Sequence, residues 1–142
     1  MHSISKTDFL LYLDAPMHLW AKKYNQLEVT APSLYDQHLM EQGQEVEKLA
    51  GEYVKKVLLE QYGDCEVYWQ RPFEDGPYIA RADVVIEDSQ AGVYDLYEIK
   101  SSTSIHKEHE YDITFQQLVC ETSISLRHVY LVHLNPDYVR LG

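Results

Sequence analysis

Cysteine is scarce in this sequence, with Cys65 and Cys120 the two among 142 residues. In a chain without an export signal, such a pair is expected as buried thiols rather than as a disulfide. Linkers are lacking too, because no Pro- or Gly-rich stretch, low-complexity run or internal repeat divides the sequence. A single domain with a core of its own is therefore expected over residues 1–142.

Long hydrophobic runs are also absent, and none of the apolar stretches reaches the length that spans a membrane. The first residues, 1–6, lack the charged region followed by an apolar core that marks a secretory signal. We therefore expect a cytoplasmic protein without a membrane partner. No glycine-rich phosphate loop or nucleophile elbow is present, which leaves little support for an unrelated small α/β enzyme.

Positive charge is the third shortage: 12 Lys and Arg face 23 Asp and Glu, for a formal net charge of -11. A protein that binds nucleic acid normally shows a basic surface, so this balance argues against such a partner. Positive residues do gather locally, at Lys22 and Lys23 and again at Lys100, Lys107 and the histidines nearby. These groups are either a local basic rim or ordinary solvated charges.

The order of elements can be read from caps, breakers and hydrophobic periodicity. Ser5 with Asp8 resembles a capping pair, Pro16 suits the first turn of a second helix, and Ser33 caps a long helix that stops near Gly63. The expected elements after these are a strand at 65–73, a hairpin of strands at 78–87 and 93–100, a polar loop at 101–111, a helix at 112–125 and a strand at 128–134. The order is thus helices, three strands, helix, strand.

The hairpin carries the most informative residues. If Asp88 faces Val93 across a four-residue turn, the antiparallel register places Asp83 directly opposite Glu98, with Cβ atoms roughly 5 Å apart. Side chains alternate along a strand, so Glu98 and Lys100 share one face. Asp83, Glu98 and Lys100 are therefore expected to converge.

Two carboxylates at such a patch suggest a divalent cation. Like charges directly opposite in a sheet destabilise it, and a partly buried carboxylate pair needs a neutralising cation. Hard oxygen ligands in small number, with room for water, suit Mg²⁺ or Mn²⁺. The alternative is a solvated hairpin face, on which acidic residues are common.

Two helices add candidates. In the long helix, Glu47 has Gly43, Ala50 and Gly51 at helical neighbour spacings, which indicates the core side, whereas Glu45 has charged neighbours. The alternative is that Glu47 lies at the edge of the apolar stripe and reaches solvent. In the later helix, Gln116 and Gln117 border a buried stripe, and one of them is expected to point at the hairpin. The expected stripe is Phe115, Leu118, Val119 and Thr122.

Together these features resemble the PD-(D/E)XK nuclease superfamily in its RecB-like branch, whose signature is an Asp on the second core strand and Glu-x-Lys on the third. Here these are Asp83 and residues 98–100. Further matching stretches lie at 5–9, 16–20, 80–83, 97–103 and 112–116, and the last three are most similar to a bacterial group of that branch with no assigned function. The resemblance as a whole covers nearly all of the chain. The resemblance implies an α/β fold with a restriction-endonuclease-like αβββαβ core, a central mixed sheet flanked by helices, and an extra N-terminal helical pair.

The resemblance also implies a metal-dependent nuclease, which hydrolyses the phosphodiester bonds of nucleic acid, with DNA the expected substrate. The metal would be Mg²⁺ or Mn²⁺, and its implied ligands are Asp83, Glu98, the Ile99 carbonyl and Glu47. Lys100 would orient the attacking water or stabilise charge, and Gln116 would position the substrate or the lysine. Lys107, His109 and His106 would approach the phosphates of the substrate. A histidine pair without a third ligand does not favour a transition-metal site.

Two departures from that family matter. Relatives with an iron–sulfur cluster have a cysteine before the proline of the opening motif, where this chain has Ala15, so no iron–sulfur cluster is expected. The helical acid of the family falls on Glu47, with Glu45 as a competing alignment. Residues 135–142 would continue into further protein in the similar group, so the chain is either an N-terminal domain or a compact stand-alone relative.

A second class of function remains open at this point. A catalytically silent module of the same fold could bind a protein or nucleic-acid partner, and the acidic balance of the chain favours it. The presence of Asp83, Glu98 and Lys100 together argues against it, because a binding scaffold does not need this costly cluster.

Overall fold

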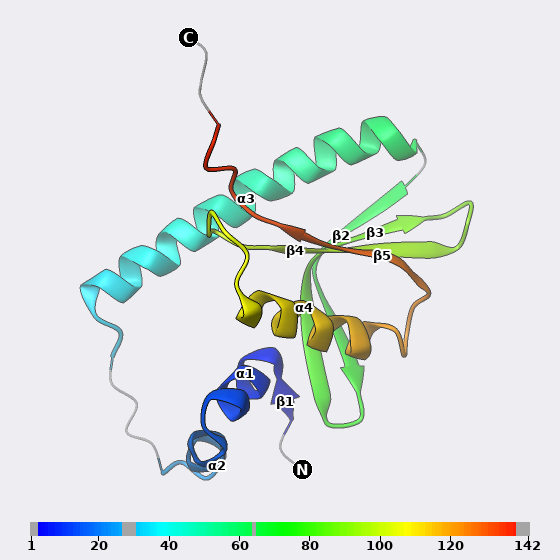
Figure 1. Cartoon of the computed structure of the whole chain (residues 1–142). Helices are drawn as coiled ribbons and strands as arrows, with labels where there is room; N and C mark the ends of the chain where they lie inside the picture. The colour runs from blue at the N-terminus through cyan, green and yellow to red at the C-terminus, as the bar shows by residue number, and fades with distance from the viewer. Residues whose placement is uncertain (1–2, 27–30, 64, 139–142) are drawn as a thin grey trace.

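The computed structural model describes residues 3–26, 31–63 and 65–138. Its elements, in chain order, are β1 (Ile4–Ser5), α1 (Lys6–Asp14), α2 (Pro16–Lys23), α3 (Leu34–Tyr62), β2 (Cys65–Asp75), β3 (Tyr78–Asp88), β4 (Val93–Ile99), α4 (Lys107–Cys120) and β5 (Leu126–Val132). The protein has an α/β fold in which a mixed sheet is flanked by helices (Figure 1). This confirms the expected α/β class, the mixed sheet flanked by helices and the order of the main elements.

The sheet is organised around β3. Strand β2 pairs with it in antiparallel fashion along one edge, while β1 and β4 share the other edge, β1 at residues 78–79 and β4 at residues 84–88. Strand β5 lies parallel to β4. Because neither β1 nor β4 pairs with residues 80–83, that stretch of β3 has open space beside it.

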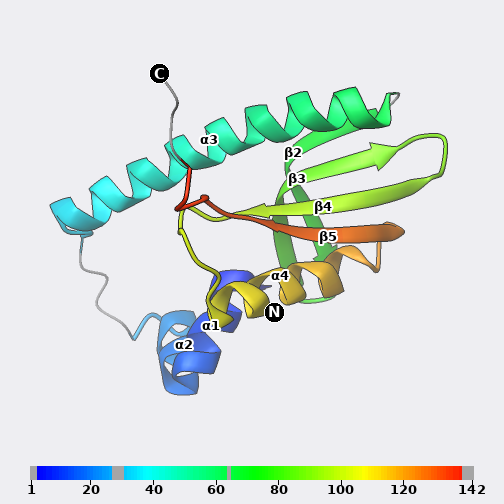
Figure 2. The same cartoon turned by 45° about the horizontal axis from the view of Figure 1, so that its top comes forward.

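Helices α3 and α4 lie on opposite sides of the sheet (Figure 2). A separate hydrophobic cluster lies on each side. Helix α4 covers one face, where Phe115 and Val119 pack against Val85 and Leu96. Helix α3 crosses the opposite face through Val54, and the cluster there is built from Val54, Val84, Ile86, Tyr97 and Ile99. Burial of these β-branched and aromatic side chains on both faces accounts for the apolar composition of β3 and β4.

The hairpin has the predicted register. Asp88 pairs with Val93, Gly92 adopts the positive φ of 67° that closes the turn, and the ladder continues to the pair of Val84 with Tyr97. The ladder ends there, so Asp83 and Glu98 do not form the direct pair that was expected. Instead, the carboxylate of Asp83 accepts the backbone N–H of Ile99 over 2.8 Å.

Strand β3 changes faces at Asp83. Ala82 belongs to the cluster beneath α4, whereas Val84 belongs to the cluster beneath α3, although strict alternation would place both on one face. Across the sheet Gln70 lies between Trp69 and Arg71, which pair with Val84 and Ala82. Gln70 has a φ of 48°, a left-handed conformation that is unfavourable for a residue with a side chain. The regular strand conformation is therefore interrupted at Gln70 in β2 and at Asp83 in β3.

The N-terminal helices begin as predicted. Ser5 and Asp8 form a reciprocal capping box on α1, and Pro16 occupies the first turn of α2. Asp8 also binds Lys22 over 2.7 Å and Lys23 over 2.6 Å, which ties α2 to the start of α1. The short strand β1 was not predicted, because its two residues are too few to show a period.

Some boundaries and facings differ from the expectations. Helix α4 begins at Lys107 rather than near residue 112, because the His109 side chain accepts the backbone N–H of His106 over 3.2 Å and caps a turn made of polar residues. Strand β5 begins two residues earlier than expected and ends at Val132. Of the expected stripe, Phe115 and Val119 are buried, but Leu118 is 62% exposed and Thr122 is exposed after the helix has ended.

Cys120, the last residue of α4, is fully buried, and burial raises the pKa of its thiol to about 12. Cys65 is half-buried beside the cluster under α3. None of the helices in the described parts of the chain has the length and apolar character needed to cross a membrane. The expectation of a longer parent protein concerns residues 135–142, of which 139–142 lie outside the described residues.

Candidate active site

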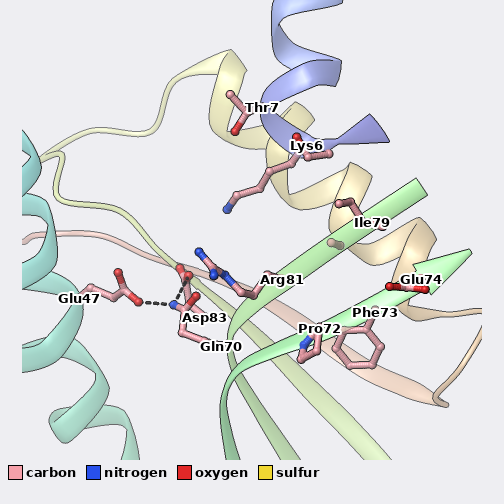
Figure 3. A pocket seen from close by; sticks show the side chains of 12 residues that line it. Lys6, Thr7, Glu47, Gln70, Pro72, Phe73, Glu74, Ile79, Arg81 and Asp83 are labelled. Atoms are coloured by element: carbon pink, nitrogen blue, oxygen red, sulfur yellow. Dashed lines mark hydrogen bonds between the residues drawn. The ribbon is translucent and has the colours of Figure 1, made fainter. Parts of the chain in front are cut away.

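A cavity of about 440 Å³ lies beside residues 80–83 of β3, which neither β1 nor β4 pairs with (Figure 3). Its walls come from the β1–α1 junction, from β2 and β3, and from α3 through Glu47. The side chains and backbone that line it belong to Ser5, Lys6, Thr7, Glu47, Gln70, Pro72, Phe73, Glu74, Ile79, Ala80, Arg81 and Asp83. The cavity therefore brings together residues that are far apart in sequence.

Asp83 is buried at the base of this cavity. One carboxylate oxygen accepts the N–H of Ile99 over 2.8 Å, and the other accepts the side-chain amide of Gln70 over 3.1 Å. The first bond ties Asp83 to the end of β4, where Glu98 precedes Ile99. The position that the sequence indicated for a metal-binding carboxylate is thus held rigidly by the sheet.

Glu47 reaches the cavity from α3. It is half-buried and accepts a second hydrogen bond from the Gln70 amide, so Gln70 bridges Glu47 and Asp83 (Figure 3). Glu45 is exposed and lies on another side of the helix, next to Leu39 and Val46. Between the two acids that the sequence left open, Glu47 is the one that faces the sheet.

Glu98 is 1% exposed and receives three hydrogen bonds. Its Oε2 accepts the side-chain amide of Gln116 over 2.6 Å. Its Oε1 accepts the ammonium groups of Lys100 over 2.7 Å and of Lys6 over 2.8 Å. Gln116, rather than Gln117, is thus the glutamine of α4 that points at the hairpin.

Lys100 joins Glu98 to a further acid, Asp112. Asp112 is buried on α4 one turn before Gln116, and its carboxylate forms an ion pair with Lys100 and lies 3.6 Å from Lys6. Burial alone would lower the pKa of Lys100, but the charges and hydrogen bonds of Glu98 and Asp112 outweigh burial and raise it. Lys100 is therefore protonated at neutral pH.

The expected substrate contacts lie at the start of α4. Lys107 is exposed, with its ammonium group 5.5 Å from the centre of the Tyr111 ring, and His109 is half-buried against His106. Burial first, and then the charges of Lys100 and His106, lower the pKa of His109. His109 is thus held toward its neutral form, which weakens its use as a phosphate-binding cation.

The acids of the site form two pairs, each joined by a nitrogen donor. Gln70 lies between Glu47 and Asp83, and Lys100 lies between Glu98 and Asp112. In the described part of the chain, no group of three or more His, Cys, Asp or Glu side chains is arranged to hold a metal ion. The expected convergence is therefore partial: Lys100 contacts Glu98 directly, whereas Asp83 reaches them through the backbone of Ile99.

The donor chemistry nevertheless fits a hard divalent cation, because Mg²⁺ in proteins is commonly held by one or two carboxylates together with several waters. Asp83, Glu98 and a backbone carbonyl at Ile99 supply such a set. A buried acceptor also stands beside them, since Oε1 of Gln116 has no hydrogen-bond partner among the described residues. A buried amide oxygen of this kind is satisfied by a water or another donor that enters the site.

Four residues of the site were not among the sequence candidates: Lys6, Gln70, Arg81 and Asp112. The sequence does contain an indication of Asp112, because this residue precedes Gln116 by four positions and so shares its helix face. The sequence also indicates Arg81, because strand alternation places residues 81 and 83 on the same face. It contains no indication of Lys6 or Gln70, since their places depend on the β1–β3 pairing and on a left-handed backbone.

Comparisons with protein-family models, with curated proteins and with solved structures found no match to this chain. The protein is thus described by its own architecture, an α/β fold with a buried acid–lysine site on the interior strands β3 and β4 of a mixed sheet.

Proposed function

We propose that this protein is a metal-dependent nuclease with a restriction-endonuclease-like PD-(D/E)XK core, acting on DNA in the cytoplasm. The observation that carries the proposal is the arrangement of two neighbouring strands. Asp83 is hydrogen-bonded to the residue after Glu98, and Lys100 is hydrogen-bonded to Glu98 itself. A buried acid–lysine cluster beside a cavity is costly for a fold to maintain, which supports a catalytic purpose.

Asp83, Glu98 and the Ile99 carbonyl are the residues that would hold Mg²⁺ or Mn²⁺, with Glu47 on the far side of Gln70. When bound, such an ion polarises the phosphate and lowers the pKa of a coordinated water. In the proposed reaction, water attacks phosphorus and one P–O ester bond breaks. The products are a phosphate monoester at one end and a hydroxyl at the other.

The protein's own contribution is electrostatic. Lys100 is held by Glu98 and Asp112, where its ammonium group would stabilise negative charge that develops on the phosphate or orient the attacking water. Gln116 fixes the orientation of Glu98, and Asp112 fixes that of Lys100. The chain thereby holds its charged groups in place before substrate arrives.

The proposal is tested by incubating labelled single- and double-stranded DNA and RNA with Mn²⁺ and the wild-type, Lys100→Met or Asp83→Asn protein. Both variants are expected to lose activity by about 10² to 10³-fold or more, since each removes a group that acts on the transition state. Circular dichroism and thermal melting establish that each variant is folded. Equal cleavage by the wild type and Lys100→Met would refute the assigned site.

The second candidate is a catalytically silent binding module of the same fold. The observation that favours it is internal neutralisation, because Lys6 and Lys100 already balance the charges of Glu98 and Asp112. For this module, Mn²⁺ would not raise the melting temperature of the wild type, and Asp83→Ala would therefore not differ from the wild type in its response to Mn²⁺. For the nuclease, Mn²⁺ is expected to raise the melting temperature of the wild type, and Asp83→Ala is expected to lose this rise.

A further inference from the structure

Lys6 stands between the two halves of the site. It is the first residue of α1, directly after the β1 residue Ser5, which pairs with Ile79 of β3. Lys6 lines the same cavity as Asp83 (Figure 3). Its ammonium group also binds Glu98, which is not among the residues that line the cavity. The Lys6 side chain therefore connects the cavity that Asp83 lines with the buried carboxylate of Glu98.

All three donors to Glu98 oppose the entry of another cation, because they already occupy both of its oxygens. Gln116 has no exposed surface, and Lys100, which directly follows β4, is held by both Glu98 and Asp112. The Lys6 side chain is 28% exposed, belongs to a separate element and borders the cavity. Lys6 is thus the donor that can leave without unfolding the site.

The charges give a reason for it to leave. Glu98 and Asp112 carry two negative charges that Lys6 and Lys100 balance. A divalent cation at Glu98 would lie within a few ångströms of the Lys6 ammonium group, where like charges repel strongly in a partly buried site. The cavity of about 440 Å³ offers the ammonium group a place to go.

We propose that Lys6 is an exchangeable internal cation, which neutralises Glu98 until a divalent metal binds and then turns into the cavity. This inference rests on the proposed metal-dependent function and concerns the regulation of the same site. Arg81 also lines the cavity and forms no hydrogen bond or ion pair with the described residues. After the exchange, Lys6 and Arg81 together face the space that a phosphate of the substrate would enter.

The test is Mn²⁺ binding, measured by electron paramagnetic resonance of the free ion, to the wild type, Lys6→Met and Lys22→Met. Lys22→Met is the matched control, because it removes the same charge from the N-terminal unit and leaves Asp8 paired with Lys23. Lys6→Met is expected to bind Mn²⁺ about five- to tenfold more tightly than the wild type, since a competing ion pair is gone. Lys22→Met is expected to bind like the wild type.

A second measurement uses the wild-type protein. Acetylation of lysines with and without Mn²⁺, read by mass spectrometry, is expected to show faster modification of Lys6 in Mn²⁺ and no change at Lys22. Equal or weaker Mn²⁺ binding by Lys6→Met, or unchanged acetylation of Lys6 despite Mn²⁺ binding, would overturn the exchange and leave the nuclease proposal standing. Absence of Mn²⁺ binding to every protein would overturn both.

Discussion

Gln116 donates a hydrogen bond from Nε2 to Oε2 of Glu98 over 2.6 Å, and both side chains are buried. Gln116→Met keeps the volume but leaves a buried carboxylate oxygen without its donor. The variant is expected to lose about 1–3 kcal/mol of unfolding free energy in urea. Gln117→Met is the control and should change stability by less than about 0.5 kcal/mol, because Gln117 bonds only to the exposed Glu121. Equal losses would show that the bond to Glu98 is unimportant.

The backbone of Gln70 supplies a second prediction. Its φ of 48° favours glycine, whereas alanine retains the steric cost of a Cβ atom. Gln70→Gly and Gln70→Ala both remove the bridge between Glu47 and Asp83, so their difference isolates the backbone. Gln70→Gly is expected to be more stable than Gln70→Ala by about 1 kcal/mol in urea denaturation. The reverse order would contradict a left-handed backbone at this position.

The stability of the N-terminal helices should depend on pH through Asp8. Burial raises the pKa of Asp8, but hydrogen bonds from Lys22, Lys23 and Ser5 outweigh it and hold the pKa far below its ordinary value of 3.8. A carboxyl with a lowered pKa stabilises the folded state above that ordinary value, and this stabilisation is lost as the pH falls further. Asp8→Asn is expected to lower the free energy of unfolding by about 1–2 kcal/mol at pH 7, because it removes the ion pairs with Lys22 and Lys23. The loss is not larger because Lys22 is partly exposed to solvent.

This cost should shrink as the pH is lowered below about 4, where Asp8 of the unfolded wild type becomes protonated. Urea denaturation at a series of pH values measures it. Asp14→Asn serves as the control, because Asp14 is an exposed acid at the other end of α1. A cost for Asp8→Asn that stays constant down to pH 3 would contradict the ion-paired geometry.

Two glycines of α3 should respond in opposite ways to alanine. A Cβ atom at Gly51 would lie 2.3 Å from the Trp69 ring, whereas at Gly43 it would meet nothing within 4 Å. Gly43→Ala is expected to stabilise the protein by up to about 1 kcal/mol through helix propensity. Gly51→Ala is expected to destabilise it by about 1–3 kcal/mol through overpacking, and to shift tryptophan fluorescence. A stabilising Gly51→Ala would show that α3 does not rest on Trp69.

The sequence predicted those features that depend on local patterns. Strand alternation and the turn before Val93 led to the observed register, and helical spacing led to Glu47 rather than Glu45. The start of α4 was missed because its cap is made by His106 and His109, which are uncommon capping residues. Leu118 was placed in the core because an apolar residue at helical spacing normally packs inward, yet it is exposed beside a surface hollow.

The candidate site was predicted less completely than the fold, for a physical reason. Asp83, Glu98 and Lys100 could be related to one another because they share a hairpin with a defined register. The contact of Lys6 with Glu98 depends on how the chain packs over long distances, and no spacing in the sequence encodes it. The bridge made by Gln70 depends on a backbone conformation that its residue type does not indicate.

The parallel pairing of β1 with β3 has a consequence for the biosynthesis of the protein. Lys6 and Glu98 are 92 positions apart, so Lys6 leaves the ribosome long before the carboxylate it neutralises. Strand β4 must be made and paired before Glu98 and the backbone of Ile99 can take their places. A nascent chain that ends before Val93 carries Lys6, Glu47 and Asp83 but lacks Glu98 and Lys100, so the acid–lysine cluster can form only after β4 has been made.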